Sequence, residues 1–164
     1  MRKQIAYLAG PLGFSEVGKK FCDETLKPAI AKIGIKILDP WELTSTELIN
    51  SAQNLPYGQE RKDKWSSVNY VIGKNNAEAI KKCDLIIAVL DGPDVDSGTA
   101  AEIGYGSALG KPTIGYRGDY RLSKENDGGT VNLQVEYFIH QNGGEIVTSL
   151  SSLEVALYKY IKKK

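Results

Sequence analysis

The segment DLIIAVLDGPDVDSGTAAEIGYGSALGKPTIGY, residues 84–116, reads as two buried strands joined by a helix. Its first part, Asp84 to Leu90, is almost wholly apolar and partly β-branched, which is typical of a strand covered on both faces of a parallel sheet. A helix is predicted from about Thr99 to Leu109, and Gly110-Lys-Pro112 ends it before a second apolar strand, Thr113 to Tyr116. This unit predicts an α/β domain with a parallel sheet.

The same alternation of apolar runs and helical spacing extends outward along the chain. Further strands are predicted at Ile5 to Ala9, Ile35 to Leu38 and Glu145 to Val147. Helices are predicted at about 17–33, kinked or split by Pro28 and stopped at Gly34, at about 64–82, at about 132–140, and after Ser151-Ser-Leu-Glu154 at the C-terminus. The spacing from 40 to about 60 is irregular, and 117–129 reads as a polar loop, either flexible or a lid. We therefore expect one domain, residues 1–164, with five parallel strands and helices on both faces.

Composition limits the kinds of partner. The chain has 164 residues, enough to bury a core without metal or disulfide staples. Lys and Arg total 21 against 20 for Asp and Glu, so the charge balance gives no reason to expect nucleic acid or an anionic membrane as a partner. A small, weakly charged ligand suits this balance better.

Metal, redox and triad chemistry are not expected. Cys22 and Cys83 lack CxxC partners, and His140 is the sole histidine. The apolar run at the N-terminus is too short for a signal peptide, and no stretch approaches the ~20 apolar residues of a membrane span. We expect a cytoplasmic protein without a metal or another cofactor.

Two carboxylates follow the strand that ends at Leu90. Asp96 and Glu102 lie where ligands gather in parallel sheets, at the carboxyl ends of the strands. Glu102 is expected in the first turn of the following helix, where the helix dipole favours the ionised state that a nucleophile needs. The segment therefore predicts a carboxylate active site.

A purely structural interpretation of both carboxylates stays open. Thr99-Ala-Ala-Glu102 matches the capping box, in which Thr caps the helix and Glu reaches back to it. Asp96 before Ser-Gly is equally compatible with a turn residue. Because a Glu102 side chain folded back onto Thr99 would not face a ligand, its direction decides between the two interpretations.

The motifs Tyr7-Leu-Ala-Gly-Pro11 and Asp96 to Pro112 resemble the nucleoside 2-deoxyribosyltransferase family. The resemblance covers most of the chain, strongest over 84–116 and weakest between about 40 and 65. It implies a flavodoxin-like five-stranded parallel sheet and a pentosyl-transferring enzyme of nucleoside salvage. Such an enzyme moves 2-deoxyribose between nucleobases through a covalent intermediate on a glutamate, which maps onto Glu102.

The resemblance also assigns roles to other positions. Tyr7 matches a tyrosine that orients the nucleophile, although it also suits a core aromatic. Asp96 matches an aspartate that contacts the base, and Gly10, Gly98, Asp39 and Trp41 fall among the substrate-binding positions. Asn132 resembles an asparagine that a neighbouring subunit contributes to the sugar hydroxyls, which implies a homo-oligomer with a shared active site; a helix N-cap is the alternative.

The chain departs from the family pattern at Asn76. Many members have an aspartate there, placed to manage the proton on the leaving base, whereas Lys74-Asn-Asn-Ala77 offers only amides. An amide binds a base but does not act as a general acid or base. Asp96, or a carboxylate of the Asp39 to Glu42 loop, would then take that role. Trp41 or Trp65 would either stack on the base or lie in the core.

Three functions remain open. The first is transfer between a 2′-deoxynucleoside and a free nucleobase. The second is hydrolysis of deoxynucleoside 5′-monophosphates, which needs a phosphate cradle, whereas Gly10-Pro-Leu-Gly-Phe14 has only Ser15 nearby. The third is a non-catalytic nucleoside or nucleotide sensor, against which the presence of Glu102 argues.

Overall fold

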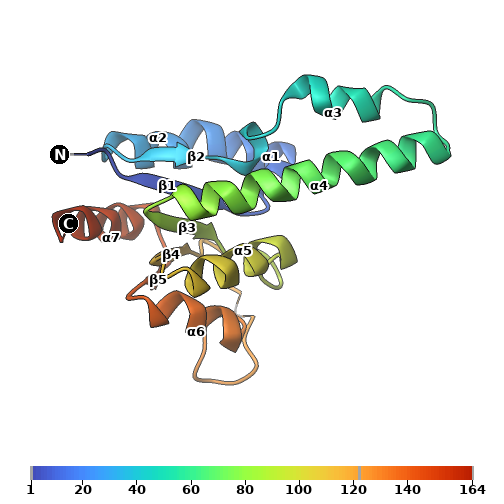
Figure 1. The fold of residues 1–164 in the computed structure, drawn as a ribbon. Helices are drawn as coiled ribbons and strands as arrows, with labels where there is room; N and C mark the ends of the chain where they lie inside the picture. Colours follow the sequence, from blue (N-terminus) through green and yellow to red (C-terminus); the bar gives the residue numbers. More distant parts are fainter. Residues whose placement is uncertain (1, 122, 164) are drawn as a thin grey trace.

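Five parallel strands form one sheet in the computed structural model, which describes residues 2–121 and 123–163. The strand order is β2-β1-β3-β4-β5, the flavodoxin-like arrangement that the resemblance implies (Figure 1). The strands are β1 (Ile5–Ala9), β2 (Lys36–Leu38), β3 (Leu85–Val89), β4 (Thr113–Tyr116) and β5 (Glu145–Val147). Every residue of β3 is buried, as its uninterrupted apolar run requires. Because β1 and β3 pair in parallel, their carboxyl ends lie side by side near the centre of the sheet.

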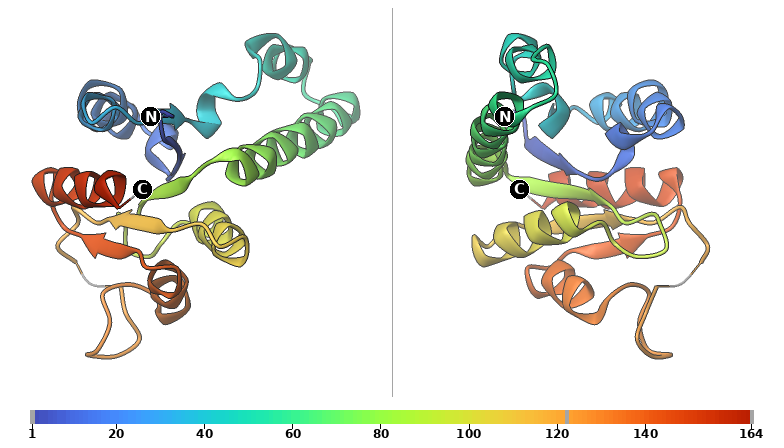
Figure 2. Two further views of the ribbon diagram at one scale, coloured as in Figure 1. Left: turned by 60° about the vertical axis from the view of Figure 1, so that its left-hand side comes forward. Right: turned by 90° about the vertical axis from the view of Figure 1, so that its right-hand side faces the viewer.

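Helices cover both faces of this sheet. Their bounds are α1 (Glu16–Phe21), α2 (Lys27–Lys32), α3 (Thr46–Gln53), α4 (Gln59–Lys82), α5 (Ser97–Ala108), α6 (Leu133–Gln141) and α7 (Leu150–Lys162). Figure 2 shows α1, α2 and α7 on one face and α4, α5 and α6 on the other. Each face has its own apolar core, because alternate residues of β1 and β3 point to opposite sides. The predicted α/β architecture with two covered faces is confirmed.

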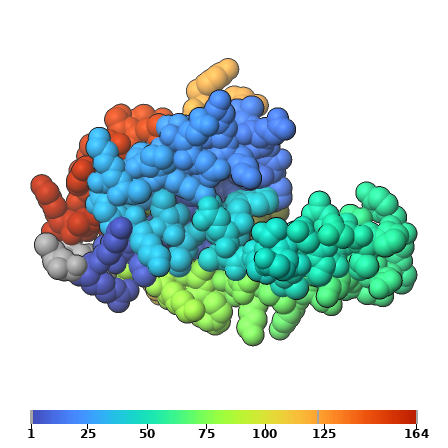
Figure 3. Space-filling model, turned by 90° about the horizontal axis from the view of Figure 1, so that it is seen from above, coloured from blue at the N-terminus to red at the C-terminus, as the bar shows by residue number. Residues whose placement is uncertain are grey.

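The segment whose spacing is irregular forms a projecting arm. A 3-10 turn, Pro40–Glu42, leads into the short helix α3, which packs on the first half of the 24-residue helix α4. Ala52 and Val68 are the buried residues of α3 and of this half of α4. Figure 3 shows the arm extending beyond the body of the molecule. The sequence places the start of α4 near residue 64, because its first turns are polar and bury little apolar surface.

Two helix boundaries differ from the sequence prediction. The break at Pro28 is accommodated by a π-helical turn, Cys22–Leu26, after which α2 begins with Pro28 in its first turn. The last helix, α7, is capped by Ser149, which forms a capping box with Ser152, rather than by Ser151 with Glu154. In the described part of the chain, no helix is both long enough and apolar enough to cross a membrane.

Candidate functional site

The side chains of Tyr7 and Glu102 meet at the carboxyl end of the central strands. Tyr7 lies on β1, pairs with Ile86 of β3 and is wholly buried. Its hydroxyl donates a hydrogen bond to Oε1 of Glu102 over 2.6 Å. That distance is typical of a bond from a hydroxyl to a charged oxygen. Tyr7 is thus both a core aromatic and a partner of Glu102, so the two alternatives raised by the sequence are compatible.

The start of α5 explains why the Glu102 side chain is free to face Tyr7. Asp96, not Thr99, is the N-cap: its Oδ2 accepts from the Thr99 backbone N–H at 2.9 Å and from the Thr99 hydroxyl at 3.1 Å. Thr99 is therefore itself capped, and the predicted Thr99–Glu102 capping box is wrong. The prediction that Glu102 lies in the first turn is wrong as well, because the helix begins at Ser97. Dipole stabilisation of Glu102 is correspondingly weaker.

Both hydrogen bonds described at the Glu102 carboxylate end on Oε1. The second comes from Nδ2 of Asn76, on α4, at 3.5 Å. Burial raises the pKa of Glu102, the Tyr7 hydrogen bond opposes that rise, and the charge of Asp96 adds to it. The pKa of the Tyr7 hydroxyl is raised by burial and by Glu102, so it remains a proton donor at neutral pH. The arrangement holds Oε1 in place and leaves Oε2 available.

Glu102 lies in a cavity of about 490 Å³, which we call the Glu102 cavity. It is lined by Gly10, Phe14, Pro40, Trp41, Thr44, Ile49, Trp65, Asn69, Ile72, Asn76, Asp96, Gly98, Thr99 and Glu102. The sequence-predicted positions Gly10, Trp41, Asn76, Asp96, Gly98 and Glu102 are thus brought together. Such a volume, with mainly apolar walls and a few polar groups, is the usual form of a small-molecule site.

Aromatic side chains form one wall of the Glu102 cavity. Trp41 and Phe14 pack edge to face with ring centroids 4.7 Å apart, and both are substantially exposed, Trp41 by 48%. Trp65 of α4 lines the same cavity and is half-buried. Trp41 is therefore not a core residue, and its ring is available to a ligand.

The two asparagines of α4 have different surroundings. Asn75 donates to the carbonyl of Leu43 at 3.2 Å and to the Thr44 hydroxyl at 3.1 Å, so it fixes the segment after the 3-10 turn. Asn76 donates only to Glu102, and its Oδ1 is buried without a hydrogen-bond partner among the described residues. Asn76, the position at which the sequence departs from the pattern that it resembles, therefore faces the Glu102 carboxylate.

Asp39 does not line the Glu102 cavity. Its Oδ1 accepts from the backbone N–H of Trp41 at 3.0 Å, and its Oδ2 pairs with Nζ of Lys27 at 2.5 Å. The substrate contact of Asp39 stays a prediction; in the structure the partly buried Lys27 holds this carboxylate in the lining of a neighbouring cavity. Through its bond to the Trp41 backbone, Asp39 helps to position a residue that lines the Glu102 cavity. Asp96 is left as the lining carboxylate besides Glu102.

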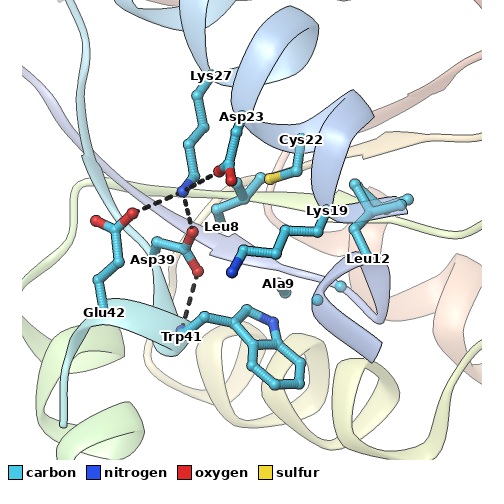
Figure 4. A pocket seen from close by; sticks show the side chains of 13 residues that line it. Leu8, Ala9, Leu12, Lys19, Cys22, Asp23, Lys27, Asp39, Trp41 and Glu42 are labelled. Atoms are coloured by element: carbon cyan, nitrogen blue, oxygen red, sulfur yellow. Dashed lines mark hydrogen bonds and ion pairs between the residues drawn. The ribbon is translucent and has the colours of Figure 1, made fainter. Parts of the chain in front are cut away.

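A second cavity of about 340 Å³ lies around Lys27. Figure 4 shows the Lys27 ammonium between Asp23, Asp39 and Glu42, at 2.9, 2.5 and 2.8 Å. Burial alone would lower the pKa of Lys27, but the hydrogen bonds to the three carboxylates outweigh it and raise that pKa. The lysine is therefore a fixed cation that anchors β2 to α2.

The described residues contain one group with the spacing of metal ligands. One ligand atom each from Cys22, Asp23 and Asp39 lies within 4.8 Å of the others. Lys27 already binds both carboxylates, and burial raises the pKa of the Cys22 thiol to about 11, so the thiolate that a metal prefers is scarce. The donor set therefore fits an ion-paired lysine better than a metal.

Asn132 lies outside the Glu102 cavity of its own chain. It is the N-cap of α6: its Oδ1 accepts from the N–H groups of Gln134 and Val135 at 3.0 and 3.3 Å. Its Nδ2 donates to Glu125 at 2.6 Å. The N-cap alternative is therefore present in the structure, and a contact with a neighbouring subunit would use the remaining N–H.

Arg117 is a site-supporting residue that the sequence analysis missed. It is 2% exposed, and its guanidinium donates to the carbonyls of Leu90, Gly92 and Arg121. These bonds hold the start of the segment between β3 and Asp96. These bonds also tie the first residues of the loop after β4 to the body. That this loop is flexible or a lid stays a prediction, and none of its described residues lines the Glu102 cavity. A buried arginine gives no periodic signal in sequence.

The chain matches the family model described as nucleoside 2-deoxyribosyltransferase over residues 6–136. An uncharacterized protein of Schizosaccharomyces pombe is 30% identical over 123 residues, which are 73% of this chain and 52% of that protein. The chain therefore spans about half the length of this curated relative.

Solved structures share the fold at lower identity. A conserved protein from Enterococcus faecalis V583 has a TM-score of 0.72 at 22% identity, over 97% of this chain and 99% of that one. A 2-deoxyribosyltransferase from Bacillus psychrosaccharolyticus has a TM-score of 0.66 at 22% identity, over 92% and 90%. A CMP N-glycosidase from Clostridium botulinum has a TM-score of 0.54 at 20% identity, over 98% and 100%.

Proposed function

Because the chain belongs to the nucleoside 2-deoxyribosyltransferase family, we propose that it transfers a 2-deoxyribosyl group from a 2′-deoxynucleoside to a free nucleobase. The observation that supports this most is the Tyr7–Glu102 pair inside an aromatic-walled cavity. Tyr7 immobilises one carboxylate oxygen, and the other is left to react. No metal or redox group is needed for this chemistry.

In the first half of the proposed reaction Glu102 is the nucleophile. Its Oε2 forms a bond to C1′ of the sugar while the bond from C1′ to the base nitrogen breaks, and that electron pair stays on the base. The positive charge that develops on the sugar is stabilised by the adjacent carboxylate, as in a retaining glycosidase. A 2-deoxy sugar lacks the electron-withdrawing 2′-hydroxyl, so the charge develops more readily and one carboxylate with a few hydrogen bonds suffices.

The second half reverses these steps with another base. A nitrogen of the incoming base bonds to C1′, and the electron pair of the ester bond returns to Glu102. The departing base gains one proton and the incoming base loses one, so the complete transfer consumes none. Asp96 lines the cavity and can give a proton to the departing base in the first half and take one from the incoming base in the second, whereas the amide of Asn76 cannot. We therefore assign proton transfer to Asp96.

The aromatic wall favours transfer over hydrolysis. Trp41, Phe14 and Trp65 offer flat apolar surfaces on which a base can stack. A base held there displaces water from the ester carbon, and water is the competing acceptor. The proposed roles of Trp41 and of the backbone at Gly10 and Gly98 are to bind and position the base and sugar.

The charges around the cavity favour a nucleoside over a nucleotide. Its described lining includes two carboxylates, Asp96 and Glu102, and no Lys, Arg or His. The Ser15 hydroxyl of the first loop accepts from the Gly18 N–H at 3.0 Å as a helix cap, and the cation nearest this loop, Lys19, lines the neighbouring cavity around Lys27 rather than the Glu102 cavity. A 5′-monophosphate hydrolase is the second candidate, supported by the shared fold of a CMP N-glycosidase. It would need a cation that reaches the substrate from outside the described lining of the Glu102 cavity.

We further propose that the active site is completed by a second copy of the chain. Asn132 would be supplied by that copy to the sugar hydroxyls, using the N–H not bonded to Glu125. The mass of the active species in solution tests this part: full activity in a strict monomer would exclude a shared site.

An isotope-exchange assay tests the transfer itself. The protein is incubated with deoxyadenosine and labelled adenine, and in parallel with deoxycytidine and labelled cytosine. Label in the nucleoside indicates transfer, whereas free base with deoxyribose and no exchange indicates hydrolysis. A matched incubation with deoxyadenosine monophosphate and deoxycytidine monophosphate tests the nucleotide hydrolase.

Two variants complete this assay. Glu102→Ala should abolish turnover, while Glu24→Ala, at an exposed glutamate, should leave it unchanged. Exchange at the normal rate in Glu102→Ala would exclude the proposed nucleophile. Binding of nucleosides without any turnover in the unmodified protein would favour the sensor.

A further inference from the structure

The outward side of α5 carries no charged side chain. Its exposed residues are Ser97, Gly98, Ala101, Tyr105 and Ala108. Glu102, the charged residue of this helix, is directed at Tyr7 instead. A helix on a protein surface normally turns charged side chains toward solvent, and a helix that is apolar around its circumference is normally buried. The outward side of α5 therefore has the composition of a surface that another molecule covers.

The neighbouring helix α6 continues this surface. A β-carbon added to Gly104 would lie 3.4 Å from the Phe138 ring, and the Gln141 amide donates to the Ser107 hydroxyl, so the two helices pack closely. The exposed residues of α6 are Leu133, Gln134, Tyr137, His140 and Gln141, among which there is no Lys, Arg, Asp or Glu. We call the exposed residues of these two helices the α5–α6 face. Contiguous exposed surface of this composition marks interaction sites.

The last helix, α7, shows the more usual pattern of a surface helix. Val155 and Tyr158 are exposed there, but so are Lys159 and Lys162. The α5–α6 face differs from α7 because two adjacent helices both lack such charges.

Helix α4, which borders α5 on the side away from α6, is basic. It contains six Lys and Arg residues against three Asp and Glu, whereas α6 contains one Glu and no Lys or Arg. Lys74 is among the exposed residues of α4. A second α4 brought to this helix would be repelled, whereas α6 would not.

The order of the three helices offers two ways to pair this surface with that of a second copy. In Figure 1, α5 lies between α4 and α6. All three helices run in the same direction, because each leads into a strand of the parallel sheet. A two-fold axis along α5 sets α5 on α5 and α4 on α6 of the other copy, whereas an axis across the helices sets α4 on α4. Since the second pairing brings two basic helices together, charge favours the first.

The surface has the size that a dimer needs. With 12 residues α5 is about 18 Å long, and three helices packed about 10 Å apart span about 30 Å. The relief of the side chains and the greater length of α4 bring this surface to the scale of the ~800 Å² that each partner buries in a stable interface.

Contacts between the helices determine which residues lie at the same level along them. Asn76 of α4 donates to Glu102 of α5, so these two residues are level. Phe138 packs at Gly104, which makes Glu136 of α6 level with Glu102. Asn76 and Glu136 therefore lie at one level on opposite sides of α5.

A two-fold axis along α5 keeps every residue of the second copy at its own level. Lys74 and Gln134, each two positions before the level of Glu102, would then face each other across the interface. Asn132 of the second copy would lie at the level of Ile72, which lines the Glu102 cavity. An axis across the helices would send Asn132 toward the opposite end of α4. The pairing that charge favours is thus also the one that brings Asn132 toward the cavity.

We propose that the α5–α6 face is the interface between two copies of this chain, with α6 of each copy lying on α4 of the other. The start of α6, including Asn132, then lies beside the Glu102 cavity of the other copy. The use of Asn132 in that cavity rests on the proposed function, whereas the interface itself does not.

Sedimentation equilibrium over a range of concentrations tests the interface. The unmodified protein should have a mass that is an even multiple of the 17.9 kDa chain. Tyr105→Arg sets a cation of each copy close to the axis and should raise the dissociation constant of the dimer roughly 100-fold, because like charges then meet in the interface. Tyr158→Arg, at an exposed tyrosine of α7, is the control and should leave this constant unchanged.

Far-UV circular dichroism shows whether the variants Tyr105→Arg and Tyr158→Arg are folded, as substitutions at exposed positions should be. A monomeric unmodified protein would overturn the proposal. Equal dissociation constants in the two folded variants would overturn it as well.

Cross-linking tests which helices meet. In the double variant Lys74→Cys/Gln134→Cys, oxidation should join two chains covalently, while the natural Cys22 and Cys83 are buried. Neither single variant should cross-link, because each new thiol would then face a residue without one. Cross-linked Lys74→Cys alone would indicate that α4 lies on α4, and an uncross-linked double variant would equally reject the proposed pairing.

Failure of the interface is distinguishable from failure of the proposed function, because neither measurement uses a substrate. An intact, correctly cross-linked dimer without base exchange would reject the proposed function alone. Where the unmodified protein does exchange bases, dissociation by Tyr105→Arg should reduce the exchange rate, since Asn132 of the second copy is lost. Full activity in monomeric Tyr105→Arg would exclude the placement of Asn132 at the cavity.

Discussion

The Tyr7 hydroxyl and Oε1 of Glu102 lie 2.6 Å apart although 95 positions separate the two residues in the chain. Tyr7 is fixed by β1 and Glu102 by α5, so two rigid elements determine the direction of the carboxylate. Such a fixed orientation is what a nucleophile requires, because reaction depends on the approach of one oxygen to the substrate carbon.

Tyr7→Phe should impair catalysis while it preserves the fold. Removing a hydrogen bond to a charged group costs about 1.5–3 kcal/mol, so kcat/KM should fall by roughly 10- to 100-fold. Because this bond lowers the pKa of Glu102, the acid limb of the pH–rate profile should move to higher pH. Steady-state kinetics across pH check both effects. Tyr70→Phe, at a tyrosine 76% exposed, is the control, and an unshifted acid limb in Tyr7→Phe would contradict the coupling.

Glu102→Gln should stabilise the protein at neutral pH. Burial raises the pKa of Glu102 in the folded state, so the folded protein holds this proton to a higher pH than the unfolded chain does. The stability associated with the group is fully present below the pKa of the unfolded chain and is lost as pH rises through the folded-state pKa. The Gln side chain of Glu102→Gln does not ionise, so the variant does not lose this stability as pH rises.

Thermal unfolding from acid to slightly alkaline pH measures the effect of Glu102→Gln. Its melting temperature should exceed that of the unmodified protein near pH 8, and the difference should shrink at acid pH. Glu24→Gln, at an exposed position, should show no such trend. A Glu102→Gln protein less stable at every pH would mean that the Tyr7 bond outweighs desolvation.

Substitutions at Asp96 can separate its cap from its chemistry. Asp96→Ala removes the N-cap of α5 and should cost about 0.5–2 kcal/mol of unfolding free energy. For a chain of this size each kcal/mol lowers the melting temperature by roughly 2–4 °C. Asp96→Asn keeps a cap of similar quality, so its melting temperature should stay near the original while turnover falls. Equal melting temperatures in the two variants would contradict the capping role.

Gly13→Ala should disturb the aromatic wall. A β-carbon there would lie 2.2 Å from Cε2 of Trp41, so the indole must move. We expect altered tryptophan fluorescence and a higher KM for the nucleoside, with little change in kcat. Gly73→Ala is the control, because nothing lies within 4 Å of its added carbon and helix propensity should stabilise it by roughly 0.5–1 kcal/mol. Unchanged fluorescence in Gly13→Ala would indicate that Gly13, rather than Trp41, moves.

The sequence predicts the framework well, because strand and helix periods are local properties. The apolar runs locate β1, β4 and β5 at the bounds that the structure shows, and the runs of β2 and β3 to within one residue. The arm formed by α3 and the start of α4 is missed, since its few buried residues leave no clear period.

Helix starts are less determined by the sequence. Asp96 and Thr99 are both good N-cap residues, and Ser149 and Ser151 present the same ambiguity at α7. Local chemistry permits either member of each pair. In the structure the upstream member of each pair, Asp96 or Ser149, is the N-cap.

By itself the sequence determined the parallel sheet, the family resemblance and the carboxylates that follow β3. Only the tertiary structure decided which way each carboxylate points: Glu102 toward Tyr7, Asp96 onto the start of α5, and Asp39 toward Lys27. The physical reason is that a side chain's direction depends on its hydrogen-bond and ion-pair partners. For Glu102 and Asp39 these partners lie on other elements of the fold, beyond the range of any local pattern.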